Sequence, residues 1–237
     1  MFTLCVCGYA RSMTTRVVRK SKPAPRSVRS DGAETRLHIL QVAGQLFAEK
    51  GFERTTSREI CSAAGTNLAA VNYHFGSRDG LYEAVLVEAH GQIVGLDDLE
   101  SIARSGVTPE AKLRKLIALV VRRSSAIDLP WGLRVLVREF MSPSTHVNTL
   151  LKQAVLPKLR VARAMIAEFL GVPDEHPLVQ RAIAFVVLPC IMLVVAPRPV
   201  LRQALPALMA DPASLAEDMG NYALAGLSSL ASLHSPH

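Results

Sequence analysis

The segment TSREICSAAGTNLAAVNYHFGSR, residues 56–78, decides the fold of this 237-residue chain. Thr56 followed three residues later by Glu59 is a capping box, in which each side chain satisfies a backbone N–H of the other residue, and it predicts the start of a helix. Gly65 is predicted to end that helix, because glycine enters the left-handed conformation without steric penalty. Asn67 is a good N-cap for a second helix directly after it. Two short helices around a glycine turn are typical of a helix-turn-helix, which sets its second helix into the major groove of DNA.

The flanking residues are predicted to complete a small helical module. Residues 34–50 repeat apolar side chains at helical spacing, and Gly51 is predicted to stop that helix. On the second helix of the motif, Leu68–His74, apolar Val71 is predicted to face inward. Ser77 is predicted to cap a further helix that carries an apolar stripe. The polar and small residues that remain exposed are the candidates for DNA contact.

Several motifs occur in order around this module. They are LFAEKGFERTT (Leu46–Thr56), the Ala64-Gly65 turn, the aromatic run Tyr73-His74-Phe75, and Leu81-Tyr82. With this spacing, residues 35–90 resemble the DNA-binding domain of TetR-type (TetR/AcrR) transcriptional regulators. NYHFGSRDGLY (Asn72–Tyr82) and REFMSPS (Arg138–Ser144) are similar to the subgroup with a CerR-type C-terminal domain.

The resemblance implies which residues meet DNA. The residues matching Tyr73 and His74 hold backbone phosphates in that family, and those matching Asn67, Leu68 and Ala69 approach base edges, although the family often has lysine where this chain has Leu68. From their chemistry, Asn67 or Asn72 is a candidate to pair with adenine. The alternative for Tyr73 and His74 is a hydrophobic plug of the module's core. The predicted DNA-binding set is Thr56, Ser57, Asn67, Leu68, Ala69, Ala70, Asn72, Tyr73, His74 and Arg78, the last as a phosphate contact beside a helix N-terminus.

The net charge of +7 does not by itself argue for this DNA-binding surface. Residues 1–31 carry +6 of it, and residues 32–90 carry −2. We therefore expect a disordered basic arm over residues 1–33, either adding phosphate contacts or remaining a solvated tail. The DNA-binding prediction depends on the helix-turn-helix.

Composition favours an all-α chain, since aromatic residues make up 5% and the apolar residues are mostly Ala, Leu and Val. Cys5, Cys7, Cys61 and Cys190 lack the spacing of a zinc site, so we expect no metal and a reducing, cytoplasmic location. Cys61 and Cys190 are interpreted as buried apolar residues. The N-terminus does not have the order of a signal peptide. No motif points to a cofactor or to an active site, so the chain is not expected to be an enzyme.

Residues 91–237 are predicted to form a helical ligand-binding and dimerisation domain after a loose connector, Gly91–Gly106. Pro157 is expected to kink or split a helix over His146–Leu170. Residues 177–196 are predicted to form a helix buried on nearly all sides. Its uncharged run, the fourteen residues Ile183–Ala196, is too short for the roughly 20 apolar residues of a membrane span. The helix is expected to pair with the last helix, which begins at Asp211-Pro212, in a four-helix dimer interface, as the family resemblance implies. The alternative is that both helices complete the core of the monomer.

A ligand pocket is predicted around the helix that ends at Met141. Its expected lining is Trp131, Leu133, Val137, Phe140 and Met141, with Arg134, Arg138 and Glu139 as polar groups. Phe169, Phe185 and Met192 are expected in the core. Mostly apolar lining indicates an apolar or aromatic effector.

The resulting hypothesis is a homodimeric, ligand-responsive regulator, most simply a repressor, that binds a palindromic operator in double-stranded DNA and is released by a small molecule. Two alternatives belong to other classes. One is a helical interaction protein whose helix-turn-helix no longer reads DNA, and the other is an enzyme acting on a small apolar substrate.

Overall fold

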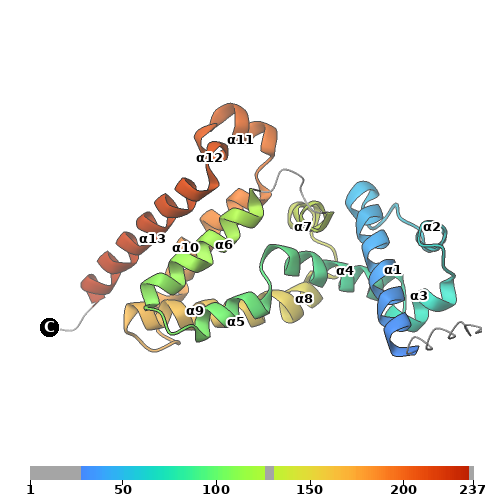
Figure 1. Ribbon diagram of the computed structural model, residues 1–237, viewed down its shortest axis with the longest axis horizontal. Coiled ribbons are helices and arrows are strands. Elements are labelled where there is room, and N and C mark those ends of the chain that lie inside the picture. The colour runs from blue at the N-terminus through green and yellow to red at the C-terminus, as the bar shows by residue number, and fades with distance from the viewer. Residues whose placement is uncertain (1–27, 126–130, 235–237) are drawn as a thin grey trace, which may run out of the picture.

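The computed structural model describes residues 28–125 and 131–234, and these residues contain helices and no strand, which confirms the all-α prediction. The helices are α1 (Val28–Lys50), α2 (Ser57–Ala63), α3 (Leu68–Phe75), α4 (Arg78–Ile93), α5 (Leu96–Arg104), α6 (Pro109–Ser124), α7 (Trp131–Met141), α8 (Val147–Leu150), a π-helical segment (Leu151–Val155), α9 (Leu156–Leu170), α10 (Pro177–Val195), α11 (Arg198–Ala204), α12 (Ala207–Ala210) and α13 (Pro212–His234). Figure 1 shows an elongated molecule with α1, α2 and α3 at one end and α6, α9, α10 and α13 at the other.

The head consists of α1 to α3 and the first turns of α4, packed around a compact apolar core. Ile39, Phe47, Ile60, Val71 and Leu81 are almost completely buried there. Burying a large apolar side chain is favourable by roughly 1.5–3 kcal/mol. The helix-turn-helix therefore rests on a core built from all four helices.

Two element boundaries differ from the sequence prediction. Helix α1 begins at Val28 and not at Glu34, with Asp31 in its first turn, where a negative charge favours the helix N-terminus. The predicted arm is thus helical over residues 28–33, and residues 1–27 lie outside the described part. The expected connector contains α5, because the Asp98 carboxylate accepts a hydrogen bond from Gly95 N at 3.1 Å and fixes a helix start.

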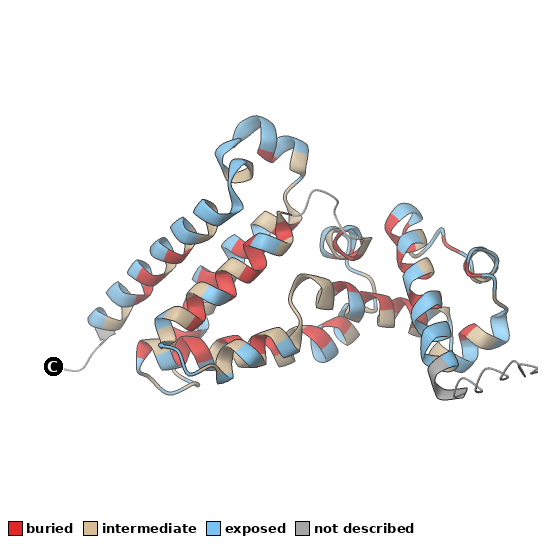
Figure 2. Ribbon diagram, in the orientation of Figure 1, coloured by how far each residue is buried: buried red, intermediate tan, exposed pale blue. Residues whose placement is uncertain are grey.

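The body is a bundle of α5, α6, α9, α10 and α13 whose facing sides are buried (Figure 2). The helix expected to kink or split near Pro157 is not split, because α8, the π-helical segment and α9 follow one another without a break, but a π-helical segment ends two residues before this proline. Proline lacks a backbone N–H and its ring crowds the carbonyl four residues earlier, so the regular hydrogen-bond pattern is disturbed before it, and a π-helical turn accommodates this. Gly171 then ends α9 in the left-handed conformation at φ 67°, as predicted.

The expectation that residues 177–196 are buried on nearly all sides is wrong. Only 28% of the most apolar 18-residue window of α10 is buried. Phe185 and Met192, expected in the core, are more than half exposed, as is Leu188, whereas Phe169 packs against the body core. The three exposed residues follow i, i+3, i+7 spacing and form one stripe along the helix. By length and by its mean hydropathy of 2.4 alone, α10 is also long and apolar enough to cross a membrane.

The head and the body are joined by α7, which packs against both α1 and α4. Two glycines permit this approach. A Cβ on Gly44 of α1 would lie 2.5 Å from the Trp131 ring of α7, and a Cβ on Gly132 would lie 2.8 Å from Ala89 Cα of α4. The head core also includes Val135 of α7, so it continues into the body across residue 90.

The two cysteines in the described part are free thiols. Cys190 is buried, as predicted, and burial raises the pKa of its thiol to about 11. Cys61 is only partly buried, against the head core. Cys5 and Cys7 lie outside the described residues.

Candidate DNA-binding surface and ligand cavity

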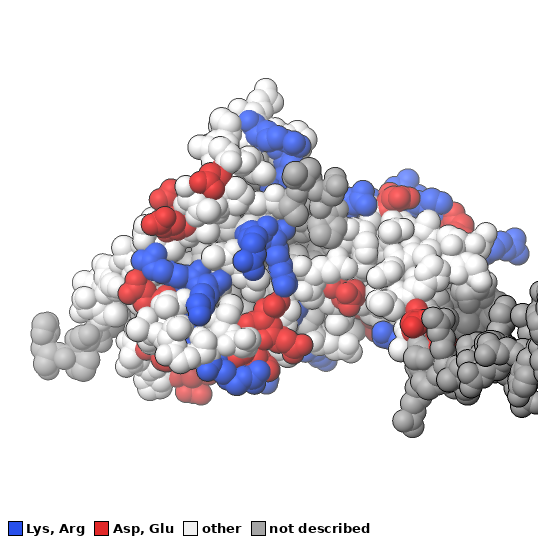
Figure 3. Space-filling model, in the orientation of Figure 1, with Lys and Arg blue, Asp and Glu red and all other residues white. Residues whose placement is uncertain are grey.

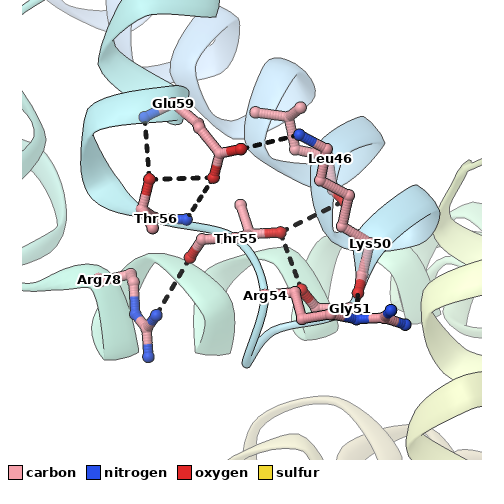
Figure 4. A network of polar contacts seen from close by, with 8 residues as sticks. All are labelled: Leu46, Lys50, Gly51, Arg54, Thr55, Thr56, Glu59 and Arg78. Atoms are coloured by element: carbon pink, nitrogen blue, oxygen red, sulfur yellow. Dashed lines mark hydrogen bonds and ion pairs between the residues drawn. The ribbon is translucent and has the colours of Figure 1, made fainter.

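The start of α2 is fixed by the predicted capping box (Figure 4). Thr56 Oγ1 accepts from Glu59 N at 3.2 Å, and Glu59 Oε2 accepts from Thr56 N at 2.8 Å. Lys50 Nζ of α1 lies 2.8 Å from the other oxygen of Glu59. The hydrogen bond from Lys50, followed by those from Thr56, lowers the pKa of Glu59 to about 2. The cap thus ties α2 to the end of α1.

The turn and the start of α3 also follow the prediction. Gly65 has φ 58°, in the left-handed region. Asn67 is the N-cap of α3, and its Oδ1 accepts from Ala70 N at 2.9 Å. A bidentate pair with adenine needs both the oxygen and the nitrogen of an amide. Because Oδ1 is held by the cap, Asn67 can turn to present both amide atoms to a base only by giving up this hydrogen bond.

Helix α3 turns Val71 into the head core, with Ala70 and Phe75 packed against that core. Its exposed residues are Leu68, Ala69, Asn72 and Tyr73. Tyr73 is 84% exposed and Leu68 is 52% exposed. The alternative that Tyr73 plugs the core is therefore wrong. His74 is partly buried, with its ring centroid 5.0 Å from that of Tyr73. Thr56, Asn67, Leu68, Ala69, Asn72 and Tyr73 are exposed, and Ser57, Ala70, His74 and Arg78 are partly buried.

Arg78, expected to grip a phosphate, is held by the protein itself. Its Nη1 donates to the Thr55 carbonyl oxygen at 3.1 Å, and its Cζ lies 4.1 Å from the centroid of the Phe52 ring (Figure 4 labels Arg78 and Thr55). Together, a hydrogen bond and a cation–π contact of this kind stabilise the fold. Arg78 thus links the start of α4 to the residues before α2.

Charge is not concentrated at the head. On the face shown in Figure 3, basic and acidic side chains are interspersed over both head and body. Helix α3 itself contains no Lys or Arg. Contacts from this helix to DNA must therefore come from polar, aromatic and small side chains.

The body contains a cavity of about 480 Å³ beneath α4, α7 and α8. Its lining is mostly aliphatic and includes residues of every helix from α4 to α10 and of the π-helical segment. Of the predicted pocket residues, Phe140 and Glu139 line it. Trp131, Leu133, Arg134, Val137, Arg138 and Met141 are not among its lining residues.

The missing residues are placed elsewhere by the orientation of α7. Trp131 packs against α1, as the short distance to Gly44 requires. The Arg138 guanidinium lies 3.5 Å from the carbonyl oxygens of Ala48 and Glu49 at the end of α1. Met141 is exposed. One face of α7 therefore packs against the head, and the neighbouring face, with Leu136, Glu139 and Phe140, lines the cavity.

Two polar groups in the cavity were not predicted. Lys158 of α9 and His90 of α4 both line it, with Lys158 Nζ 2.7 Å from His90 Nδ1. The sequence did hold a signal for Lys158, because it shares helical spacing with Val155 and Ala162, which also line the cavity. Lysine is rarely buried in a folded protein unless its charge is paired.

Glu139 connects the cavity to the head. It is buried, and its Oε2 accepts from the Tyr82 hydroxyl of α4 at 2.9 Å. Its Oε1 accepts from Ser144 N and Ser144 Oγ at 2.9 and 2.8 Å. Burial, and then the Glu139 charge, raise the pKa of Tyr82 above its usual value, so its hydroxyl stays a donor.

His146, just before α8, makes a second connection to the head. Its ring lies 3.2 Å from Glu83 Oε1 and 3.6 Å from Asp79 Oδ1, both on α4. The ring also meets that of Phe52 edge-on at 5.1 Å between centroids. Val147 follows directly and lines the cavity. The segment from Glu139 to Val147 therefore touches the cavity on one side and the head on the other.

Comparison with known families matches both parts of this arrangement. Residues 39–85 match the model of bacterial regulatory proteins of the tetR family. Residues 109–228, about half of the chain, match the model of the C-terminal domain of the HTH-type transcriptional dual regulator CecR. The chain belongs to the TetR family. The subgroup expected from the C-terminal motifs is confirmed, and its C-terminal domain is the one named after CecR.

The relatives that this chain matches are named as HTH-type transcriptional regulators. AcrR of Shigella flexneri is 32% identical over 96 residues, which are 40% of this chain and 44% of AcrR, so the match spans less than half of that relative. CecR of Shigella flexneri is 25% identical over 175 residues, covering 65% of this chain and 76% of CecR. The fold is similar to FadR of Bacillus subtilis in complex with stearoyl-CoA, with TM-score 0.62 and 14% identity over 80% of this chain and 98% of FadR. TetR-family regulators are ligand-responsive DNA-binding proteins.

Proposed function

We propose that this chain is a homodimeric transcriptional repressor that binds an inverted-repeat operator and leaves it when a small molecule occupies the cavity. The observation that carries the proposal is the exposed surface of α3. The Asn67 cap fixes where this helix begins, its Val71 side anchors it to the head core, and Tyr73 points to solvent at 84% exposure. A rigid helix with an exposed aromatic side chain is suited to enter a groove.

The residues on this surface divide into two roles. Tyr73 and His74 are assigned to backbone phosphates, which fix the register of a protein on DNA without reading sequence. Ala69 and Ala70 allow close entry and contact a thymine methyl. Asn72 is exposed and is assigned to adenine in preference to Asn67, whose Oδ1 caps α3.

A mobility-shift titration with duplex DNA from upstream of the chain's own gene tests this assignment. Tyr73→Ala is expected to weaken binding to specific and nonspecific DNA alike, by about tenfold, since one charge-assisted hydrogen bond is lost. Asn72→Ala is expected to relax sequence preference, and Asn148→Ala, an exposed asparagine on α8, is the control. If Tyr73→Ala and Asn72→Ala both bound the operator like the wild-type protein, α3 would not be the reading helix.

The dimer is assigned to the exposed faces of α10 and α13. Phe185, Leu188 and Met192 form the stripe on α10, and Tyr222 is exposed on α13. A contiguous exposed apolar stripe is typical of an interaction site. TetR-family regulators dimerise, and pairing these two helices with their twins gives a four-helix contact. A twofold pair then presents two α3 helices to half-sites roughly 34 Å apart, which is why the operator is expected to be an inverted repeat.

Release is assigned to the segment from Glu139 to Val147. A ligand in the cavity meets Glu139 and Phe140, and Glu139 holds Tyr82 of α4. The tilt of α4 sets the distance between two heads, so a change at this contact alters how the dimer matches DNA. By linkage, DNA must weaken ligand binding by the same factor by which the ligand weakens DNA binding. Such a regulator acts in the cytoplasm, where its operator is.

A further inference from the structure

The cavity holds a buried positive charge. The two buried lysines in the described part of the chain differ in whether a carboxylate pairs with them. Lys112 is 7% exposed, and its Nζ lies 2.8 Å from a carboxylate oxygen of Glu168. Lys158 is 9% exposed, and its Nζ contacts only the His90 ring. Within residues 28–125 and 131–234, no carboxylate forms an ion pair with Lys158 at 4.0 Å or less.

The contact with His90 does not neutralise that charge. An ammonium group has only N–H donors, so His90 Nδ1 must accept, and the imidazole is neutral with its proton on Nε2. Burial, and then the charge of Lys158, lower the pKa of His90 to about 4, in agreement with this tautomer. Burial lowers the pKa of Lys158 to about 8, opposed by the more distant charge of Glu88, so Lys158 is mostly protonated at pH 7. Two of its three N–H donors remain available.

Glu139, the one carboxylate among the described residues that line the cavity, already accepts hydrogen bonds on both oxygens. Tyr82 donates to one of its oxygens, and the backbone N and hydroxyl of Ser144 donate to the other. The lining near Lys158 is otherwise aliphatic, with Val155, Leu159 and others. A charge in apolar surroundings is costly unless it is paired with an opposite charge. A molecule that fits this cavity therefore has an anionic group to pair with Lys158 and an apolar part to lie against the aliphatic lining.

We propose that the cavity binds an apolar carboxylate of the fatty-acid kind, whose carboxylate oxygens accept hydrogen bonds from Lys158 Nζ while its hydrocarbon chain lies along the aliphatic wall. This rests on the proposed function only in taking the cavity as the effector site. A volume of about 480 Å³ lies within the range of small-molecule sites, roughly 300–1,000 Å³. A neutral alcohol leaves the ammonium without a counter-charge, and an amine is repelled by it.

Calorimetric titration of the full chain without DNA, at pH 7, tests the ligand class. The probes are decanoate, decanol and decylamine, which share one hydrocarbon chain and differ in the charge of the head group. Decanoate is expected to bind at least about tenfold more tightly than decanol, and decylamine more weakly than either, because a hydrogen bond to a charged group is worth roughly ten- to a hundredfold in affinity. Equal affinities for decanoate and decanol would overturn the proposal.

Variants of the lysine sharpen the test. Lys158→Met keeps the length of the side chain and removes the charge, so decanoate is expected to bind about ten- to a hundredfold more weakly, with decanol within about threefold of the wild type. Lys158→Arg is expected to keep the preference for decanoate. Lys152→Met, at an exposed position outside the cavity lining, is the control. Undiminished decanoate binding by Lys158→Met would also overturn the proposal.

A separate readout distinguishes this inference from the proposed function. The mobility shift is repeated with decanoate present. If decanoate binds through Lys158 but leaves the operator complex intact, the ligand class is upheld and the release mechanism is wrong. If the operator is not bound at all, the calorimetric preference for decanoate still decides the ligand class.

Discussion

Replacing Tyr82 by phenylalanine isolates the contact that joins the cavity to the head. The substitution removes only the hydroxyl that donates to Glu139 Oε2 at 2.9 Å, and the ring stays packed against Phe47 at 5.0 Å between centroids. Glu139 is buried and keeps the two bonds from Ser144 on its other oxygen. A hydrogen bond to a charged acceptor contributes roughly 1.5–3 kcal/mol. Tyr82→Phe is therefore expected to lower the free energy of unfolding by about 2 kcal/mol.

Urea denaturation at fixed protein concentration measures this loss. Tyr73→Phe, at an exposed tyrosine, is the control and is expected to stay within about 0.5 kcal/mol of the wild type. A double-mutant cycle with Glu139→Gln then assigns the energy to the pair. If Tyr82→Phe unfolds like the wild type, or if the two substitutions are additive, the contact is not an energetic link between cavity and head. In the mobility shift, Tyr82→Phe is expected to keep operator binding while responding less to the effector.

Three further outcomes are expected. Gly44→Ala places a Cβ 2.5 Å from the Trp131 ring, and this clash should outweigh the gain of roughly 1 kcal/mol in helix propensity, so urea denaturation should show a net loss of about 1–3 kcal/mol in the free energy of unfolding. Gly91→Ala, with open space around its Cβ, should show only the gain. The free energy of unfolding should fall as pH drops from 6.5 to 4, by at most about 1.4 kcal/mol per pH unit, because His90 is protonated in the unfolded chain below pH 6.5 but stays neutral in the folded chain down to about pH 4. In denaturation curves measured over this pH range, His90→Gln should show a weaker dependence on pH. Phe185→Asp puts an unpaired charge into the proposed dimer face and should weaken association about a hundredfold in sedimentation experiments, without unfolding the chain.

The parts of the head that the sequence predicted well are those governed by local chemistry. The caps at Thr56, Asn67 and Ser77 depend on a side-chain oxygen meeting an amide three residues later. Gly65 depends on its own backbone preference. Such features need no knowledge of the rest of the chain. The start of α5 is equally local, through Asp98, but the surrounding glycines concealed it.

The cavity could not be predicted in the same way, because it is assembled from seven helices, α4 to α10, and the π-helical segment. Helix α7 is apolar on two sides, and periodicity does not tell which side meets α1 and which meets the cavity. Trp131 and Arg138 were assigned to the ligand and are used by the head. His90 and Lys158 are 68 residues apart and meet only when α4 and α9 pack. Their pairing is a property of tertiary structure.

Helix α10 shows how far composition alone can determine burial. Its run of apolar side chains predicts removal from water, and that inference holds for the face that meets α6 and α9. For the stripe of Phe185, Leu188 and Met192, the sequence indicates that another apolar surface should bury it, but not which molecule provides that surface. A monomer core, a membrane and a second copy of the chain all satisfy the same hydropathy. The stripe lies on the same helix as Cys190 and Val194, which line the cavity, so a partner docked there would restrain the cavity wall as well as the spacing of the heads. Dimerisation and ligand response in this chain are therefore expected to be coupled through α10.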